Sequence, residues 1–130
     1  MDLRVRFAET DQMGVAHHSA YVIWFEAARV EWLRARGLDY RRLEAGGVSL
    51  AVSAISVQYL RSSRFDDALH IGATLTELRS RRVRYRYLVT RGEERVATGD
   101  SLHTPVDPNG RVTRLPAVWL EALEEHVSKS

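Results

Sequence analysis

Alternating apolar and polar residues mark several segments of the chain as β-strands. The pattern begins at residues 3–7 and recurs at residues 69–78 and 83–89. Residues 48–59 are rich in Val, Ile and Ser, and residues 95–106 lead into the turn sequence DPNG. A period of two places successive side chains on opposite faces of a sheet. The pattern therefore predicts about five strands.

One long apolar helix is predicted between the first two strands. Ser19 is a typical N-cap residue and Gly37 is typical just beyond a helix end. The first turns between them are apolar on nearly every side, so we expect this helix to be buried on most sides. A shorter helix should follow Pro116. Because helices and strands do not alternate, the order predicts an α+β fold, an antiparallel sheet wrapped round one central helix in a single domain over residues 1–130.

Composition limits the possible partners and cofactors. The chain has 130 residues, 45% of them hydrophobic, which suffices for one core. It has no Cys, so disulfides and thiolate metal sites are excluded and a cytoplasmic location is favoured. The longest apolar run, residues 21–25, is too short to span a bilayer. A net charge of +2 without a recognisable RNA-binding motif argues against a nucleic-acid partner.

The residues able to do chemistry gather in the stretch ETDQMGVAHHSAY, from Glu9 to Tyr21. Asp11 lies in a loop, where a carboxylate commonly caps a turn. Gly14 permits a positive φ, and the stretch leads into the N-terminus of the predicted helix, whose amides favour an oxyanion. Acyl transfer needs at least a nucleophile or base, which a carboxylate can provide, and amides that receive the negative charge of the carbonyl oxygen. The stretch indicates acyl-transfer chemistry, with turn capping as the simpler role of Asp11.

Two pairs of polar residues nearby need separate interpretations. His17 and His18 are adjacent, so their side chains diverge, and no metal-binding spacing accompanies them. We expect no metal site, and one histidine lining a polar cleft. Glu26 and Arg29 are three residues apart on the predicted helix, and we expect an ion pair that fixes the register of the helix or of subunits.

The stretch RVRFAETDQMGVAHHSAYVIWFEAAR, residues 4–29, closely resembles the signature of hotdog-fold acyl-CoA thioesterases of the 4-hydroxybenzoyl-CoA thioesterase type, especially their Tol-Pal-associated bacterial branch. The segments VQYLRSSRFDDALHIGATL and VDPNGRVTRLP resemble further landmarks of that family, so the likeness covers nearly the whole chain. It implies a hotdog fold and hydrolysis of an acyl-CoA to a carboxylic acid and CoA, without a metal or organic cofactor. It also implies a homodimer or homotetramer with active sites between subunits.

The same resemblance implies roles for individual residues. Asp11 falls on the catalytic carboxylate, which acts as nucleophile or general base. The amide of His18 would polarise the thioester carbonyl, and the His18 side chain is a second candidate. Gly14 and Tyr21 fall on the family motif and are expected in the substrate site. His17 departs from the family, which tends to carry an aromatic or aliphatic residue there.

A cluster of arginines is the candidate contact for the nucleotide part of CoA. Arg79, Arg81 and Arg82 lie at a predicted turn between two strands. Guanidinium groups suit the 3′-phosphate and diphosphate of CoA, although a solvated hairpin fits the pattern equally well.

Two other functions stay open at this point. One is a non-catalytic module that binds acyl-CoA or acyl-carrier protein, and the other is a (de)hydratase of the same fold. Asp11 distinguishes both alternatives from hydrolysis. A binding module needs no acid beside the thioester, and the setting Thr-Asp-x-x-Gly fits hydrolysis better than it fits a (de)hydratase.

Overall fold

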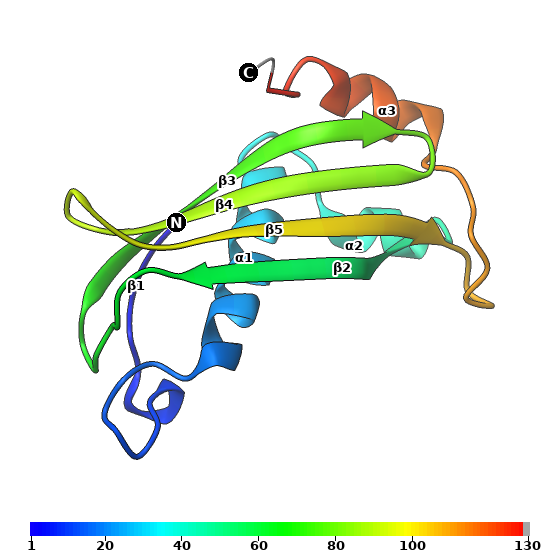
Figure 1. Cartoon of the computed structure of the whole chain (residues 1–130). Helices are drawn as coiled ribbons and strands as arrows, with labels where there is room; N and C mark the ends of the chain where they lie inside the picture. The colour runs from blue at the N-terminus through cyan, green and yellow to red at the C-terminus, as the bar shows by residue number, and fades with distance from the viewer. Residues whose placement is uncertain (129–130) are drawn as a thin grey trace.

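A curved antiparallel sheet of five strands packs against one long helix (Figure 1). This computed structural model describes residues 1–128, so residues 129–130, the end of the predicted domain, lie outside the described part. In chain order the elements are β1 Asp2–Arg4, the 3-10 turn η1 Phe7–Glu9, α1 His18–Arg34, α2 Tyr40–Ala45, β2 Ser49–Tyr59, β3 Ala68–Arg79, β4 Arg82–Arg91, β5 Glu94–Val106 and α3 Ala117–Glu124.

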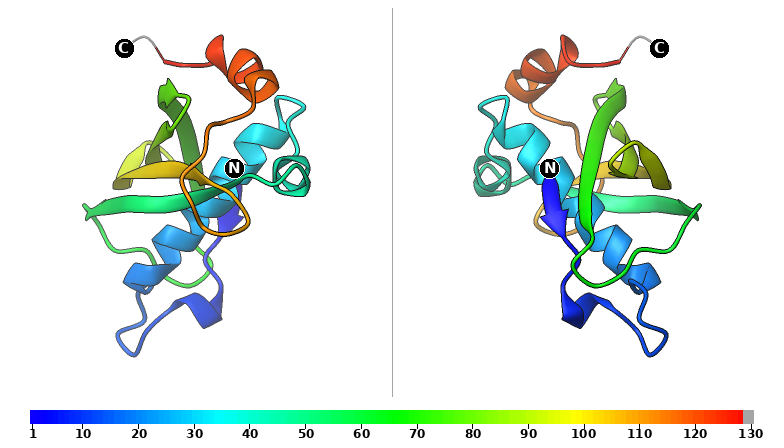
Figure 2. Two further views of the ribbon diagram at one scale, coloured as in Figure 1. Left: turned by 90° about the vertical axis from the view of Figure 1, so that its right-hand side faces the viewer. Right: turned by 90° about the vertical axis from the view of Figure 1, so that its left-hand side faces the viewer.

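The strand order of the sheet is β1-β3-β4-β5-β2. Short turns join β3 to β4 and β4 to β5. The chain passes from β1 at one edge to β2 at the other edge, beside β5, through the long segment that contains α1 and α2. The predicted alternation is confirmed in β4, where Tyr85 and Tyr87 are buried while Arg86 is exposed. Figure 2 shows α1 crossing one face of the sheet. The arginine-bearing face of β4 is turned away from α1, as expected.

The end of the first strand and the start of the long helix differ from the sequence prediction, and the short helix α2 was not predicted. The first strand ends at Arg4, because the Arg6 amide donates to Glu9 Oε1 at 2.8 Å and turns the following residues into η1. The long helix begins at His18, because Nδ1 of His17 accepts a hydrogen bond from the Ser19 amide at 3.2 Å. His17 therefore performs the capping role that we expected of Ser19.

The expectation that α1 is buried on most sides is wrong for a single chain. The side of the helix that faces the sheet, which includes Trp24, Phe25 and Ala28, is buried. On another side, however, Ile23 is 57% exposed and Val22 is 37% exposed. One chain therefore covers only part of an unusually apolar helix.

The contact between Phe25 and β5 determines how closely α1 approaches the sheet. The Phe25 ring stacks on Tyr87 with 4.3 Å between ring centroids and 4° between ring planes. Beside this pair lies Gly99 of β5, where even a methyl group would overlap the Phe25 ring. A glycine in the middle of a strand here permits the close approach of another element.

We predict that Gly99→Ala destabilises the fold by about 1 to 3 kcal/mol, because the added methyl group pushes Phe25 out of its place. Gly72→Ala is the matched control, since Gly72 also lies in a strand and its nearest new neighbour would be the Leu88 carbonyl oxygen at 3.9 Å. Urea unfolding of both variants measures the difference. Equal stabilities would show that the Phe25 contact does not limit the approach of α1.

Candidate active site

The loop that carries Asp11 is a narrow turn held at both sides. The Asp11 amide donates to the Val15 carbonyl at 2.9 Å, and the His17 amide donates to the Glu9 carbonyl at 2.7 Å. The Gly14 amide returns to the Asp11 carbonyl at 3.0 Å, and Gly14 has a φ of 79°, as its predicted role requires. The loop therefore fixes Asp11 directly ahead of α1.

Asp11 caps this turn with one of its two carboxylate oxygens. Oδ1 accepts hydrogen bonds from the amides of Met13 at 2.8 Å and Val15 at 3.4 Å. Oδ2 has no hydrogen-bond partner among residues 1–128, and the side chain is exposed. Asp11 therefore does cap the turn. Capping uses only Oδ1, so Oδ2 is available for chemistry.

The same turn occurs a second time in the chain, at the sequence DPNGR. Asp107 Oδ1 accepts from the amides of Asn109 at 2.9 Å and Arg111 at 3.0 Å. The Asp107 amide donates to the Arg111 carbonyl, and Gly110 has a φ of 78°. Asp-x-x-Gly is therefore a turn motif in this chain, and what sets Asp11 apart is the helix that follows it.

At the start of α1, one amide is left without a partner. The Ser19 amide is held by Nδ1 of His17, and the Ala20 amide donates to the His17 carbonyl at 3.0 Å. Within residues 1–128 the His18 amide makes no hydrogen bond. A free amide at the positive end of a helix dipole is a donor for an oxyanion.

A hollow of about 200 Å³ is lined in part by His18. The ring of His18 faces Tyr59 there, with 4.8 Å between ring centroids, and the Tyr59 hydroxyl donates to the His18 carbonyl at 3.0 Å. The hollow is lined by Val15, Ala16, His18, Tyr21, Tyr59, Leu60, Arg61 and Ser62. Of the predicted site residues, the structure thus brings His18 and Tyr21 together in one hollow at the end of the Asp11 loop.

The Tyr21 side chain lines this hollow, while its hydroxyl is hydrogen-bonded to Ser63. The hydroxyl lies 2.8 Å from Ser63 Oγ in a buried hydrogen bond, and burial raises the pKa of Tyr21. Sequence reasoning missed both Ser63 and Tyr59 as neighbours of the site. The signal was present, because both belong to the segment VQYLRSSRF that carries part of the family resemblance.

Glu9 is a further residue that sequence reasoning missed. Its side chain is 10% exposed and accepts hydrogen bonds from the Arg6 amide and from Trp24 Nε1, both at 2.8 Å. Burial pushes the pKa of Glu9 upward, but the hydrogen bonds from Arg6 and Trp24 outweigh it, so this pKa lies below its ordinary value. Glu9 thereby ties the site loop to α1.

A second brace holds the loop to the start of β3. The Ala16 amide donates to the Ser63 carbonyl at 2.7 Å, and Asp67 Oδ2 accepts from the Arg64 amide at 2.8 Å and from Arg91 Nη1 at 2.9 Å. Asp66 adopts a φ of 67° in the same turn. The acidic pair that follows Phe65 is therefore structural.

The arginine turn lies far from Asp11 within one chain. The site loop is bridged to Arg64, just ahead of β3, whereas Arg79, Arg81 and Arg82 lie at the opposite end of that strand. At a rise of roughly 3.3 Å per residue, the length of β3 puts roughly 36 Å between the Asp11 loop and the arginine turn. Glu77 lies 3.3 Å from Arg79 and 3.9 Å from Arg82. One chain does not bring these arginines to its own Asp11.

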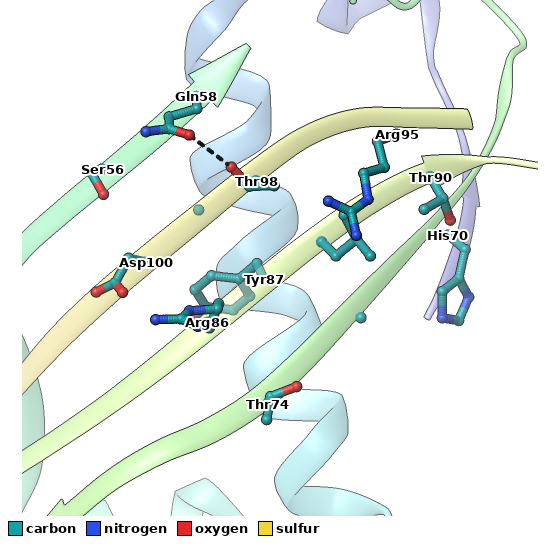
Figure 3. A pocket seen from close by; sticks show the side chains of 13 residues that line it. Ser56, Gln58, His70, Thr74, Arg86, Tyr87, Thr90, Arg95, Thr98 and Asp100 are labelled. Carbon is teal, nitrogen blue, oxygen red and sulfur yellow. Dashed lines mark hydrogen bonds between the residues drawn. The ribbon is translucent and has the colours of Figure 1, made fainter. Parts of the chain in front are cut away.

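A larger hollow, of about 800 Å³, lies elsewhere, on the sheet face turned away from α1 (Figure 3). Its lining includes Arg86, Arg95 and Asp100, and Gln58 is hydrogen-bonded to Thr98 at 3.3 Å. None of the predicted catalytic residues reaches it, so its size alone does not make it the active site.

Two kinds of feature are absent from the described residues. In residues 1–128, no group of three or more His, Asp or Glu side chains is placed to hold a metal ion. No helix of that part of the chain is long and apolar enough to cross a membrane.

Comparison with known proteins gives a consistent result. The model of the family described as the thioesterase-like superfamily matches residues 5–123. A hypothetical protein from Thermus thermophilus is 38% identical, with a TM-score of 0.92 over 97% of each chain. A DHNA-CoA thioesterase from Staphylococcus aureus is 26% identical, with a TM-score of 0.92 over 96% of this chain and 87% of that one. The acyl-CoA thioester hydrolase YbgC of Escherichia coli O6:H1 is 36% identical over 77 residues, 59% of this chain and 58% of the relative. The predicted α+β hotdog architecture is confirmed.

We predict that Glu9→Gln lowers the free energy of unfolding at pH 7 by about 1 to 2 kcal/mol, because charge-assisted hydrogen bonds are lost. The pKa of Glu9 is lower in the folded chain, so its stabilisation is present above the ordinary glutamate pKa of about 4.3 and disappears as pH falls through the folded value. Urea unfolding of wild type and variant at neutral and acidic pH should show the gap closing. Glu93→Gln, at an exposed residue, is the control, and a gap that stays constant with pH would contradict the assignment.

Proposed function

The chain belongs to the thioesterase-like superfamily and is a thioester hydrolase, and we propose that it cleaves acyl-CoA thioesters to a carboxylic acid and free CoA. The observation that carries this proposal is that one short loop joins a carboxylate oxygen to a helix-terminal amide, and neither group has a hydrogen-bond partner within residues 1–128. Assignment to the 4-hydroxybenzoyl-CoA type and its Tol-Pal-associated branch, like a cytoplasmic location, stays a prediction.

The proposed mechanism uses the His18 amide and the Asp11 carboxylate in different roles. The amide receives the thioester carbonyl oxygen, where negative charge develops as the carbonyl carbon becomes tetrahedral. Asp11 either attacks that carbon, giving a mixed anhydride and releasing CoA thiolate, or takes a proton from an attacking water. In the first case water then cleaves the anhydride, regenerates the Asp11 carboxylate and supplies the proton that the thiolate takes up. In the second case Asp11 passes the proton taken from the water to the departing thiolate, so CoA is released as the thiol by either route. The His18 ring, which lies against Tyr59, orients the substrate.

The proposed working unit is a homodimer or a homotetramer. Strand β2 is an unpaired edge, and its residues Val52 and Ile55 face the same side of the sheet as buried His103 and Ser101, their neighbours on β5. Even so, Val52 is 52% exposed and Ile55 is 40% exposed. Pairing two β2 edges across a two-fold axis would satisfy the edge and cover these side chains.

The same pairing offers a role for the arginine turn. A two-fold axis between antiparallel β2 edges places the second sheet with its strands running in the opposite direction. The β3–β4 turn of one copy then lies on the side of the Asp11 loop of the other copy. We propose that Arg79, Arg81 and Arg82 bind CoA phosphates held in the site of a second copy.

Thiol release from a panel of acyl-CoAs tests the proposed function. We expect the purified chain to release CoA from at least one short, medium or aromatic acyl-CoA without added metal and in the presence of a chelator. The panel should include an enoyl-CoA assayed for hydration, which separates hydrolysis from the (de)hydratase alternative. No thiol release from any member would leave a binding module as the better description, and turnover abolished by the chelator would contradict the metal-free mechanism.

We predict that Asp11→Asn lowers kcat by about 10² to 10⁴ while KM changes far less, because the ionised carboxylate is lost. An asparagine oxygen can still accept from the Met13 amide, so the turn should survive. Asp107→Asn alters the same turn away from the site and should leave kcat unchanged. His18→Ala should cost less than Asp11→Asn, since the backbone donor remains.

Steady-state kinetics and thermal unfolding of all three variants provide the measurement. If Asp11→Asn keeps a kcat near that of the wild type, or if Asp107→Asn loses as much kcat as Asp11→Asn, then Asp11 only caps its turn and has no catalytic role.

A further inference from the structure

Arg29 is a half-buried cation that has no counter-ion in the part of the chain that the structure describes. Its Nη1 donates a long hydrogen bond of 3.4 Å to the Tyr87 hydroxyl. Among residues 1–128, no carboxylate lies within ion-pair distance of it, and the predicted ion pair with Glu26 does not form. A guanidinium that is partly withdrawn from water without an opposite charge is unfavourable, so this position calls for an anion.

The groups around Arg29 orient it without neutralising it. Tyr87 is hydrogen-bonded to Ser101 Oγ at 2.6 Å, and Ser101 Oγ lies 2.7 Å from Nε2 of His103, all three residues being buried. Burial and the nearby Arg29 charge lower the pKa of His103 to about 3, so its imidazole stays neutral. Burial likewise raises the pKa of Tyr85, whose hydroxyl therefore stays protonated. The missing negative charge must come from outside this cluster.

Glu26 supplies a carboxylate of the required kind on the same helix. It lies one turn before Arg29, is exposed, and makes no ion pair or hydrogen bond within residues 1–128. Its neighbours Val22 and Ile23 expose apolar side chains on this part of α1. An apolar patch that carries one unpaired anion and one unpaired cation is complementary in charge to a second copy of itself.

We propose that Glu26 of each copy pairs with Arg29 of the other across a two-fold axis, with the exposed apolar residues of α1 packed around the two ion pairs. The inference rests on the dimer in the proposed function. In a two-fold interface, if residue i contacts residue j of the partner, j also contacts i, so one contact provides two ion pairs. Because Arg29 is already half-buried in the single chain, part of its desolvation cost is met before association.

Charge reversal in trans tests this arrangement. Glu26→Arg gives a chain with two basic residues at these positions, and Arg29→Glu gives a chain with two acidic ones. Each variant alone places like charges opposite each other, so its dimer dissociation constant should rise at least about tenfold in sedimentation experiments. The two variants mixed should form a heterodimer in which both pairs are complementary, well above the fraction that random pairing gives in native mass spectrometry. The double variant E26R/R29E should dimerise again.

A matched control comes from the exposed pair Glu31 and Arg34, which is bonded within one chain. Glu31→Arg and Arg34→Glu should neither weaken dimerisation nor select heterodimers when mixed. If a single reversal at residue 26 or 29 fails to fold alone, co-expression of the two variants gives the same readout, and Glu26→Gln and Arg29→Gln should weaken the dimer without repulsion.

The outcomes separate this inference from the proposed function. If the wild-type chain is a fully active monomer, the proposed dimer and this pairing are both wrong, but the proposed hydrolysis of acyl-CoA is not contradicted. A wild-type dimer with random mixing of the two reversed variants would overturn the pairing alone. Arg29→Gln that leaves dimerisation unchanged but lowers turnover of acyl-CoAs with a distal carboxylate would also overturn it, by assigning Arg29 to the substrate.

Discussion

The close contact of Phe25 with Gly99 and Tyr87 determines where the whole of α1 lies. A helix is stiff, so fixing one residue against the sheet also fixes residues along the axis in both directions. The His18 amide lies two turns before Phe25, roughly 10 Å along the axis, and Arg29 lies one turn after it. The proposed oxyanion donor and the unpaired cation therefore both depend on a glycine in the middle of β5. Their positions are consequences of core packing.

The two Asp-x-x-Gly turns have the same local structure and differ in the segment that follows them. At Asp11 and at Asp107, the same hydrogen bonds hold the same turn, with glycine at a positive φ. The turn at Asp107 leads into an extended segment, whereas the turn at Asp11 leads into a helix whose first amide is free. The motif alone accounts for the fold of the loop, and the proposed reaction requires its combination with α1. Turn capping and the proposed catalysis are compatible uses of one carboxylate, because capping occupies Oδ1 and leaves Oδ2 without a partner within residues 1–128.

The parts of the structure that depend on local pattern could be predicted from the sequence, and those that depend on distant contacts could not. The alternation around Tyr85 and Tyr87 identified β4 because strand periodicity is a property of neighbouring residues. The turn at Asp11, with Gly14 at a positive φ, was likewise predicted from residue types. His17 as the helix cap, by contrast, requires a ring nitrogen in place of the hydroxyl that usually caps. Glu9 becomes a site residue only through Trp24, fifteen positions later. Tyr59 reaches His18 only because β2 ends beside the start of α1.

The expected ion pair between Glu26 and Arg29 failed for a reason that bears on assembly. Spacing of three residues makes such a pair available on any helix, but an exposed pair contributes little. Arg29 instead donates to the buried hydroxyl of Tyr87, which leaves Glu26 without a partner among the described residues. In the proposed dimer both charges are satisfied by the second copy, on the same helix whose first turn would hold the thioester carbonyl. Association and catalysis then share one rigid element, so a change that shifts the middle of α1 at the interface also shifts the amide at its end.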